Sequence, residues 1–199
     1  MIIKVCGMRE PQNIREVAAL AINWIGFIFY ERSKRFVERC PTEQQVTDSE
    51  QLSPKKVGVF VNATIESMME KASAYKLDYL QLHGNESPED CHTLQKRGYS
   101  LIKAFPIATK EDFEKTREYE GRVDYFLFDT RCEGYGGSGK RFDWSILTEY
   151  KGETPFLLGG GIRPENAEAI RNFRHPRLAG IDLNSGFEIE PGLDRKSVV

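Results

Sequence analysis

Residues 155–162 read Pro-Phe-Leu-Leu-Gly-Gly-Gly-Ile, and residues 178–186 read Leu-Ala-Gly-Ile-Asp-Leu-Asn-Ser-Gly. Each stretch is an apolar run that ends in a cluster of small residues. Glycine has no Cβ, so an anion can lie against the backbone N–H groups, and the N-terminus of a following helix would add its positive dipole end. Two such strand ends near the end of an alternating strand and helix chain are typical of the phosphate site of a (β/α)8 barrel.

Short apolar runs rich in Ile, Val and Phe recur along the whole chain at intervals of about 20 to 30 residues. Runs of this length and composition are typical of buried parallel strands. We expect eight strands, at Ile2–Cys6, Trp24–Phe29, Lys56–Val61, Tyr79–Leu82, Leu101–Phe105, Tyr125–Phe128, Pro155–Leu158 and Ala179–Leu183.

Polar stretches with helical periodicity separate these strands, and several open with a Pro, Ser or Thr suited to a first helical turn. The alternation predicts an α/β fold, and its regular spacing favours a closed TIM barrel over an open sheet of about five or six strands. We expect residues 1–199 to form one barrel domain, with an abbreviated last helix because Glu188–Val199 is short for a full one. The helical stretches include Glu10–Ala21, Thr64–Tyr75, Ser87–Arg97, Thr109–Tyr119 and Arg163–Phe173.

Charge and hydropathy restrict the classes of partner. The net charge of −2 and the pI of about 6.0 provide no basic face for a phosphodiester backbone, so we expect a small phosphorylated metabolite and no nucleic acid. No stretch approaches the ~18 apolar residues of a membrane span, and Met1–Val5 leads into a strand instead of a signal peptide. We therefore expect no membrane partner and a cytoplasmic location.

The four cysteines, Cys6, Cys40, Cys91 and Cys132, are widely spaced and form no C-x-x-C pair. In a cytosolic chain this spacing argues for free thiols and against disulfides or a zinc site. Each thiol is most simply a small buried hydrophobe. We expect no metal.

Several predicted strands end in chemically reactive side chains. Cys6 ends the first strand, Arg35 lies in the loop after the second, His83 follows the fourth, Asp129 follows the sixth, and Asp182 lies in the eighth. In a barrel of this kind the catalytic groups come from the carboxyl ends of the strands and from the loops that follow. A thiol and a carboxyl group facing each other across the barrel mouth could act as general base and general acid if burial or neighbouring charges bring each pKa toward neutrality.

Six motifs in a characteristic order and spacing extend this reading. They are Lys4-Val5-Cys6-Gly7, Val57-Gly58-Val59-Phe60-Val61-Asn62, Leu80-Gln81-Leu82-His83-Gly84-Asn85-Glu86, Gly136-Gly137-Ser138-Gly139-Lys140 with Phe142-Asp143-Trp144, the triple glycine Gly159-Gly160-Gly161, and Ile181-Asp182-Leu183-Asn184-Ser185-Gly186. With this set the chain resembles, from end to end, phosphoribosylanthranilate isomerase, the third-step isomerase of tryptophan biosynthesis.

The resemblance implies a cofactor-free Amadori rearrangement of N-(5-phosphoribosyl)anthranilate to 1-(2-carboxyphenylamino)-1-deoxyribulose 5-phosphate. It implies that Asp129 is the general acid that protonates the furanose ring oxygen, and that Cys6 is the general base that removes the C2 proton. A thiol suits this role because its reference pKa of about 8.5 needs only modest lowering. Arg35 would bind the anthranilate carboxylate, since a guanidinium matches a planar carboxylate bidentately.

The resemblance also implies the remaining contacts. His83 and Asp182 would contact or orient polar groups in the pocket. From the residues themselves, the glycines of Gly134–Gly139 fit either an ordinary loop or a flexible lid that closes over substrate. The implied partner is a small phosphosugar. The sequence leaves the assembly open between a monomer and a homodimer. The phosphate would be held by Gly160, Gly161, Ser185 and Gly186.

Two other functions remain open from the residues alone. A phosphate-metabolite binding barrel that has lost catalysis would share the fold and the phosphate site, although both Cys6 and Asp129 are present. Indole-glycerol-phosphate synthase also shares them, but its reaction requires a lysine acid and a further carboxylate on the inner strands. Here the fourth strand ends in Gln81 and His83, and Lys103 is the only inner-strand lysine in the middle of the chain.

Overall fold

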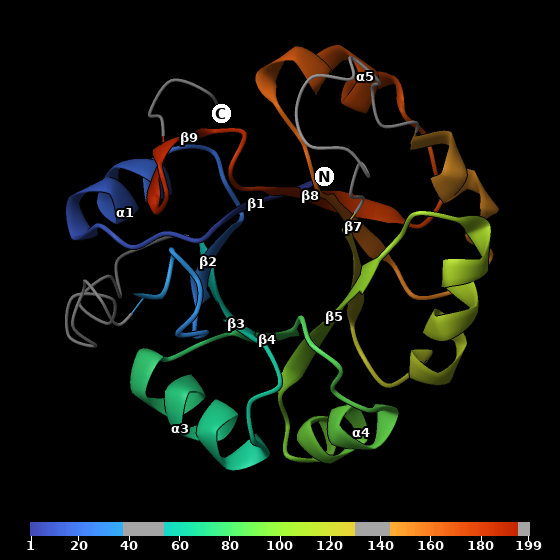
Figure 1. The fold of residues 1–199 in the computed structure, drawn as a ribbon, viewed down its shortest axis with the longest axis horizontal. Helices are drawn as coiled ribbons and strands as arrows, with labels where there is room; N and C mark the ends of the chain where they lie inside the picture. The colour runs from blue at the N-terminus through green and yellow to red at the C-terminus, as the bar shows by residue number, and fades with distance from the viewer. Residues whose placement is uncertain (38–53, 130–143, 195–199) are drawn as a thin grey trace.

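The fold is a closed barrel of eight parallel strands, as the sequence predicts (Figure 1). The computed structural model describes residues 1–37, 54–129 and 144–194. The strands follow one another around the barrel in chain order, and β8 closes it by pairing with β1. The alternative of an open sheet is therefore wrong.

The observed strands agree with the predicted ranges to within one residue at each end. This agreement arises because buried parallel strands carry continuous apolar runs whose limits can be read directly. The strands are β1 Ile2–Cys6, β2 Trp24–Ile28, β3 Lys55–Phe60, β4 Tyr79–Leu82, β5 Ser100–Pro106, β6 Tyr125–Asp129, β7 Phe156–Gly159 and β8 Leu178–Leu183.

Large apolar side chains fill the inside of the barrel. Trp24, Val57, Ile102, Leu127 and Leu157 belong to one buried cluster contributed by five different strands. A larger cluster lies between the barrel and the helices around it. The inside of the barrel is therefore packed core, and open space for a ligand is left at the mouth.

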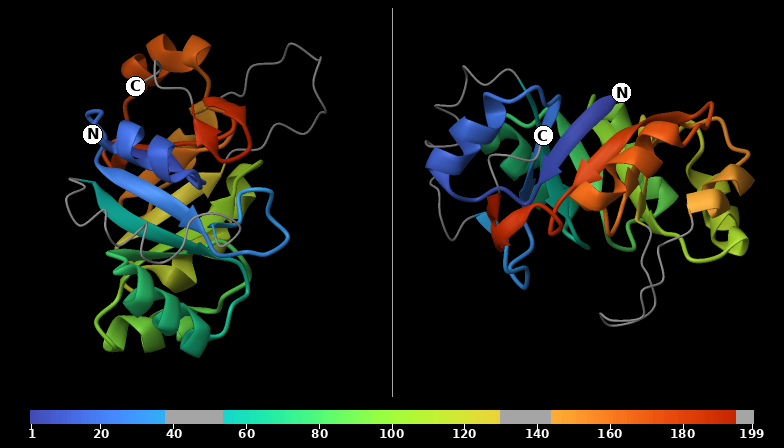
Figure 2. Two further views of the ribbon diagram at one scale, coloured as in Figure 1. Left: turned by 90° about the vertical axis from the view of Figure 1, so that its left-hand side faces the viewer. Right: turned by 90° about the horizontal axis from the view of Figure 1, so that it is seen from above.

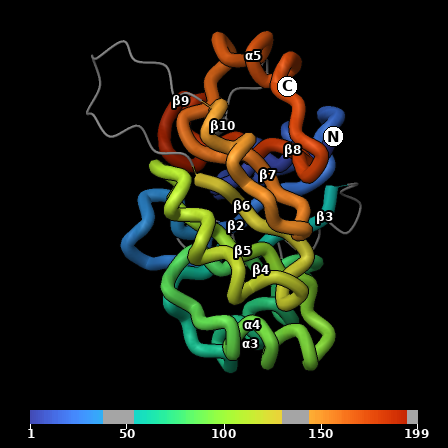
Figure 3. Tube along the Cα trace, turned by 90° about the vertical axis from the view of Figure 1, so that its right-hand side faces the viewer, coloured from blue at the N-terminus to red at the C-terminus, as the bar shows by residue number. Residues whose placement is uncertain are grey.

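The α-helices lie around the outside of the barrel. Figure 3 shows α3 and α4 together on one side of the molecule and α5 on the opposite side. The Thr and Ser that open two predicted helices act as caps: Thr64 Oγ1 accepts from the Ser67 N–H at 3.2 Å, and Ser87 forms a capping box with Asp90. The helices are α1 Pro11–Ala18, α3 Ile65–Tyr75, α4 Pro88–Lys96 and α5 Ala167–Asn172.

One predicted α-helix is instead a 3₁₀ helix, η3, at Lys110–Tyr119. Its side chains pair three residues apart, as in Lys115 with Asp112 at 2.9 Å, and the Thr116 hydroxyl donates to the carbonyl oxygen of Phe113 at 2.7 Å. A spacing of three residues matches one turn of a 3₁₀ helix. Periodicity alone indicates a helix and does not decide between the α and the 3₁₀ form.

Lys103 faces away from the barrel interior, so its description as an inner-strand lysine is wrong. Its neighbours Ile102 and Ala104 belong to the interior cluster, and strand alternation directs Lys103 to the outside. Its ammonium donates to the carbonyl oxygen of Gly84 at 2.7 Å and lies 3.3 Å from the Glu86 carboxylate. Lys4, by contrast, lies inside the barrel, where it pairs with Asp182.

After β8 the described chain forms a short antiparallel hairpin, β9 Glu188–Glu190 with β10 Leu193–Asp194, and not a helix. Figures 1 and 2 show this hairpin beside α1. Within the part of the chain that the structure describes, no helix is long and apolar enough to cross a bilayer.

Candidate active site

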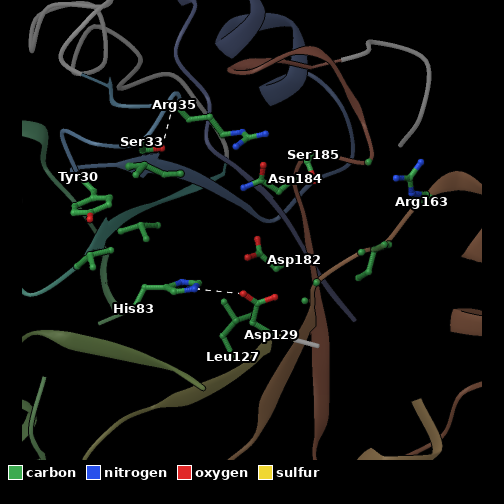
Figure 4. A pocket seen from close by; sticks show the side chains of 18 of the residues that line it. Tyr30, Ser33, Arg35, His83, Leu127, Asp129, Arg163, Asp182, Asn184 and Ser185 are labelled. Carbon is green, nitrogen blue, oxygen red and sulfur yellow. Dashed lines mark hydrogen bonds and ion pairs between the residues drawn. The ribbon is translucent and has the colours of Figure 1, made fainter. Parts of the chain in front are cut away.

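A cavity of about 820 Å³ opens at the carboxyl ends of the strands (Figure 4). Strand ends and the loops after them supply its walls, as expected for this architecture. Eight of the nine predicted site residues line it: Arg35, His83, Asp129, Gly160, Gly161, Asp182, Ser185 and Gly186. Cys6 does not line the cavity directly, and its side chain is buried, with 4% exposed.

His83 and Asp129 form a pair across two strands. Nε2 of His83 lies 3.5 Å from Oδ2 of Asp129, and Figure 4 shows the two side chains pointing toward each other. On its other side, Nδ1 of His83 lies 3.0 Å from Nε2 of the buried Gln81, which precedes it by two residues and shares its face of the strand. The imidazole is thus held between an amide and a carboxyl group.

Lys4 and Asp182 form a buried ion pair at the base of the cavity. The register of β1 and β8 sets these two residues side by side, and Lys4 Nζ lies 2.8 Å from Asp182 Oδ1. Burial lowers the pKa of Lys4, but Asp182 and the Cys6 thiol raise it, and the net shift is upward. Burial raises the pKa of Asp182 and Lys4 opposes that shift. The pair therefore places a fixed cation inside the barrel, next to the thiol.

Burial dominates the electrostatics of Cys6. It raises the pKa of the thiol to about 11, with Asp182 adding to the shift and Lys4 opposing it. The thiol thus keeps its proton at neutral pH in the ligand-free protein. Among the described residues that act on Cys6, Lys4 is the strongest influence toward the thiolate.

Arg35 lies at the rim of the cavity with its guanidinium already engaged. Its backbone N–H donates to Ser33 Oγ at 3.1 Å, and its Nε donates to a carboxylate oxygen of Glu188 at 2.6 Å. Burial lowers the pKa of Arg35, but the hydrogen bond to Glu188 outweighs it and the net shift is upward. The guanidinium is a permanent cation facing the cavity.

The two glycine-containing loops predicted as a phosphate site lie together, because β7 and β8 are neighbours. The close approach is visible at Gly186, where a Cβ would lie 2.0 Å from the carbonyl oxygen of Ile162. Only glycine fits there. Although the sequence predicts a helix N-terminus directly behind these loops, no long α-helix begins there within residues 144–194: β7 leads into a 3₁₀ turn, Pro164–Asn166, and β8 leads into the hairpin. The dipole of a helix N-terminus therefore contributes less to the site than expected.

Four residues of the site were not among the sequence-predicted candidates: Lys4, Asn184, Arg163 and Glu188. Lys4 carried a readable signal, because a charged residue two positions before Cys6 shares its face of a buried strand. Asn184 lines the cavity, and its Oδ1 is buried with no hydrogen-bond partner among the described residues. Glu188 had no local signal, because its partner lies 153 residues earlier.

Some sequence expectations fall outside the described residues, namely those for Cys40, Cys132 and the glycine-rich loop Gly134–Gly139. Cys91 is described, and it is a free, buried thiol, in keeping with a packing role. Burial raises its pKa to about 12. Cys6 is likewise free.

Known proteins share both this barrel and its sequence. The family model described as N-(5'phosphoribosyl)anthranilate (PRA) isomerase matches residues 3–198. The N-(5'-phosphoribosyl)anthranilate isomerase of Parabacteroides distasonis is 97% identical over 193 residues, which cover 97% of this chain and 87% of that protein. The crystal structure of phosphoribosyl anthranilate isomerase from Thermotoga maritima is similar with a TM-score of 0.85 and 31% identity, covering 100% of this chain and 95% of that one.

A second solved structure carries a ligand. It is phosphoribosyl anthranilate isomerase in complex with reduced 1-(o-carboxyphenylamino)-1-deoxyribulose 5-phosphate, with a TM-score of 0.82 and 28% identity over 100% of this chain and 94% of that one. The sequence match and the structural match both run over nearly the whole barrel, from β1 to the hairpin. The chain therefore belongs to the phosphoribosylanthranilate isomerases, the isomerase family of tryptophan biosynthesis.

Proposed function

We propose that this isomerase rearranges N-(5-phosphoribosyl)anthranilate with Asp129 as general acid and Cys6 as general base. The observation that carries the proposal is the grouping of the His83–Asp129 pair and the glycine-containing loops at one cavity, with the buried Cys6 thiol close to Lys4 and Asp182 at its base. These are an acid, a phosphate site and a base, the three elements that the reaction needs.

The first step is opening of the sugar ring. Asp129, in its protonated form, gives its proton to the furanose oxygen, the bond from that oxygen to C1 breaks, and the nitrogen lone pair forms the Schiff base. His83 supports this step by its position, since its Nε2 lies 3.5 Å from Oδ2 of the Asp129 carboxyl.

The second step is removal of the C2 proton. The Cys6 thiolate takes this proton, which yields an enolamine that tautomerises to the ketone. Because burial holds the pKa of Cys6 near 11, the thiolate must be stabilised as it forms, and the buried ammonium of Lys4 is the group suited to that task. How strongly Lys4 stabilises the Cys6 thiolate therefore depends on its pairing with Asp182.

Binding groups lie at two parts of the rim. Arg35 is suited to the anthranilate carboxylate, and Gly160, Gly161, Ser185 and Gly186 are suited to the phosphate. Arg163, which also lines the cavity, adds a cation beside these loops. The Asn184 amide oxygen is an acceptor in need of a donor, which a sugar hydroxyl would supply.

The experiment is a continuous assay with freshly generated N-(5-phosphoribosyl)anthranilate, following the loss of its anthranilate fluorescence. Cys6→Ala and Asp129→Asn are each expected to lower kcat by about 10³-fold or more with little change in ligand affinity, as for loss of an essential acid or base. Unchanged turnover in Cys6→Ala would refute the assigned base. An inactive wild-type protein that still binds the product analogue would favour the catalytically silent barrel.

We further propose that residues 1–199 act as one barrel domain in the cytoplasm, on a free phosphosugar. The family match over residues 3–198 and the free thiols of Cys6 and Cys91 support this. Whether the protein is a monomer or a homodimer stays a prediction, and sedimentation at several protein concentrations distinguishes the two.

A further inference from the structure

The guanidinium of Arg35 is held by a carboxylate of the protein itself. Glu188, at the start of the β9–β10 hairpin, accepts from Nε of Arg35 at 2.6 Å and from Nη2 of the same group. This is a two-bond pairing along one edge of the planar guanidinium. The hairpin thus reaches a residue that lies in the loop after β2.

The pair is built to persist when a ligand binds. The Glu188 side chain is only 6% exposed, and one of its oxygens also accepts from the Gly192 N–H at 3.1 Å. Pulling Arg35 away would leave a nearly buried carboxylate without its cation, which is strongly unfavourable. A substrate carboxylate therefore gains nothing by displacing Glu188.

The guanidinium has a second edge available for the substrate. Arg carries five N–H donors, and Glu188 engages those of Nε and one of Nη2, so Nη1 and the remaining Nη2 hydrogen form another fork. Arg35 lines the cavity and is 22% exposed. A substrate carboxylate in the cavity can therefore bind the open edge of a guanidinium whose other edge is already held by Glu188.

The aliphatic part of the Arg35 side chain is fixed as well as its guanidinium. The aliphatic part of Arg35 lies against the end of β1, where Gly7 has a φ of +85° and a Cβ would lie 2.6 Å from Arg35 Cδ. Ser33 Oγ accepts from the Arg35 N–H at 3.1 Å. With the loop and the stem constrained, the orientation of the guanidinium plane depends on Glu188.

We propose that Glu188 is a positioning residue for recognition of the aromatic carboxylate: it holds Arg35 by one edge so that the other edge faces the substrate. The inference rests on the proposed role of Arg35. It makes the C-terminal hairpin part of the specificity site, although the hairpin itself contributes no group to the chemistry.

The test compares two ligands on three proteins. The ligands are reduced 1-(2-carboxyphenylamino)-1-deoxyribulose 5-phosphate and the same molecule without the carboxylate. The proteins are wild type, Glu188→Gln, which keeps the size of the side chain and removes its charge, and Glu190→Gln, the matched change at an exposed position of the same hairpin. Dissociation constants come from titration calorimetry, and kcat and KM from the fluorescence assay.

Glu188→Gln is expected to weaken binding of the ligand that carries the carboxylate about five- to tenfold, the effect of losing one charge-assisted contact. The ligand that lacks the carboxylate should bind to this variant within about twofold of its affinity for wild type. KM should rise by a similar factor with kcat nearly unchanged, and Glu190→Gln should behave as wild type. Tighter binding of the carboxylate ligand would mean that Glu188 competes with the substrate. Equal weakening of both ligands would mean a purely structural role, and no change in either would mean no role; each overturns the proposal.

A fourth protein separates this proposal from the one on which it rests. If Arg35→Met binds the two ligands with the same ratio of affinities as wild type, the assignment of Arg35 to the carboxylate is wrong whatever Glu188 does. If the ratio of the two affinities falls toward one in Arg35→Met but equals the wild-type ratio in Glu188→Gln, only the positioning role of Glu188 fails.

Discussion

At the scale of single residues, burial and the charges packed around Cys6 together set the reactivity of its thiol. Burial is the largest cause of its raised pKa, Lys4 lowers the pKa, and Asp182 raises it. Three further groups belong to the same surroundings: Arg35 interacts with Cys6, and His83 and Asp129 act on Asp182. Changing one of these charges should shift the pKa of the Cys6 thiol in a direction that the sign of the charge predicts.

Asp182→Asn is expected to lower the pKa of Cys6 and to speed its alkylation by iodoacetamide at pH 8. The change removes a negative charge and leaves the Lys4 ammonium with the thiolate as its main partner. Each unit of pKa corresponds to about a tenfold change in the thiolate fraction. Peptide mass spectrometry measures the rate, with Cys91, which is buried elsewhere, as the reference thiol. Alkylation of Cys6 that is unchanged or slower would show that Asp182 does not govern the thiol.

At the scale of secondary-structure elements, a buried ion pair joins the loops that follow β3 and β4 to strand β5. Glu86 accepts from the Asn62 N–H at 2.8 Å and from the Gly84 N–H at 2.9 Å, and it pairs with Lys103 at 3.3 Å. Both side chains of the pair are 3% exposed. The loop that begins at His83 is therefore tied to its neighbours directly behind the cavity.

Lys103→Met is expected to lower the free energy of unfolding by about 3 kcal/mol or more, because it leaves the Glu86 carboxylate buried without its cation. Urea denaturation followed by circular dichroism measures the change. Lys96→Met, at an exposed position of α4, serves as the matched control and should stay within about 0.5 kcal/mol of wild type. If the two variants are equally stable, the pair contributes nothing to holding the loops.

At the scale of the whole molecule, buried thiols couple the stability of the barrel to alkaline pH. In the folded protein the pKa of Cys6 is raised from 9.0 to about 11 and that of Cys91 from 9.0 to about 12, in both cases mainly by burial. Above pH 9 the unfolded chain releases these protons while the folded chain keeps them. The unfolded state is then favoured, so stability falls as the pH rises from 9 toward 11.

The expected result is a free energy of unfolding that is nearly constant from pH 7 to 8.5 with respect to these thiols and declines steadily above pH 9. Urea titrations at each pH give the slope. Cys91→Ala should make the decline shallower, because one of the two raised groups is gone. An identical slope in the variant would show that Cys91 titrates alike in the folded and unfolded states.

The sequence determined the order of the elements and the identity of the strand-end residues. Buried parallel strands are continuous apolar runs, and caps such as Thr64 and Ser87 mark helix starts, so both can be read locally. Because catalytic groups in a barrel gather at the carboxyl ends of strands, His83, Asp129 and Asp182 could be assigned to one mouth before any coordinates were known.

The tertiary structure alone decided which groups are paired. Lys4 meets Asp182 across 178 residues of sequence, and Arg35 meets Glu188 across 153. Those contacts depend on the register with which β8 closes against β1 and on the hairpin that follows, neither of which leaves a periodic signal in the chain. Periodicity shows which face of an element is buried, but the partner on that face depends on how distant elements pack, and this packing sets the charge around Cys6 and Arg35.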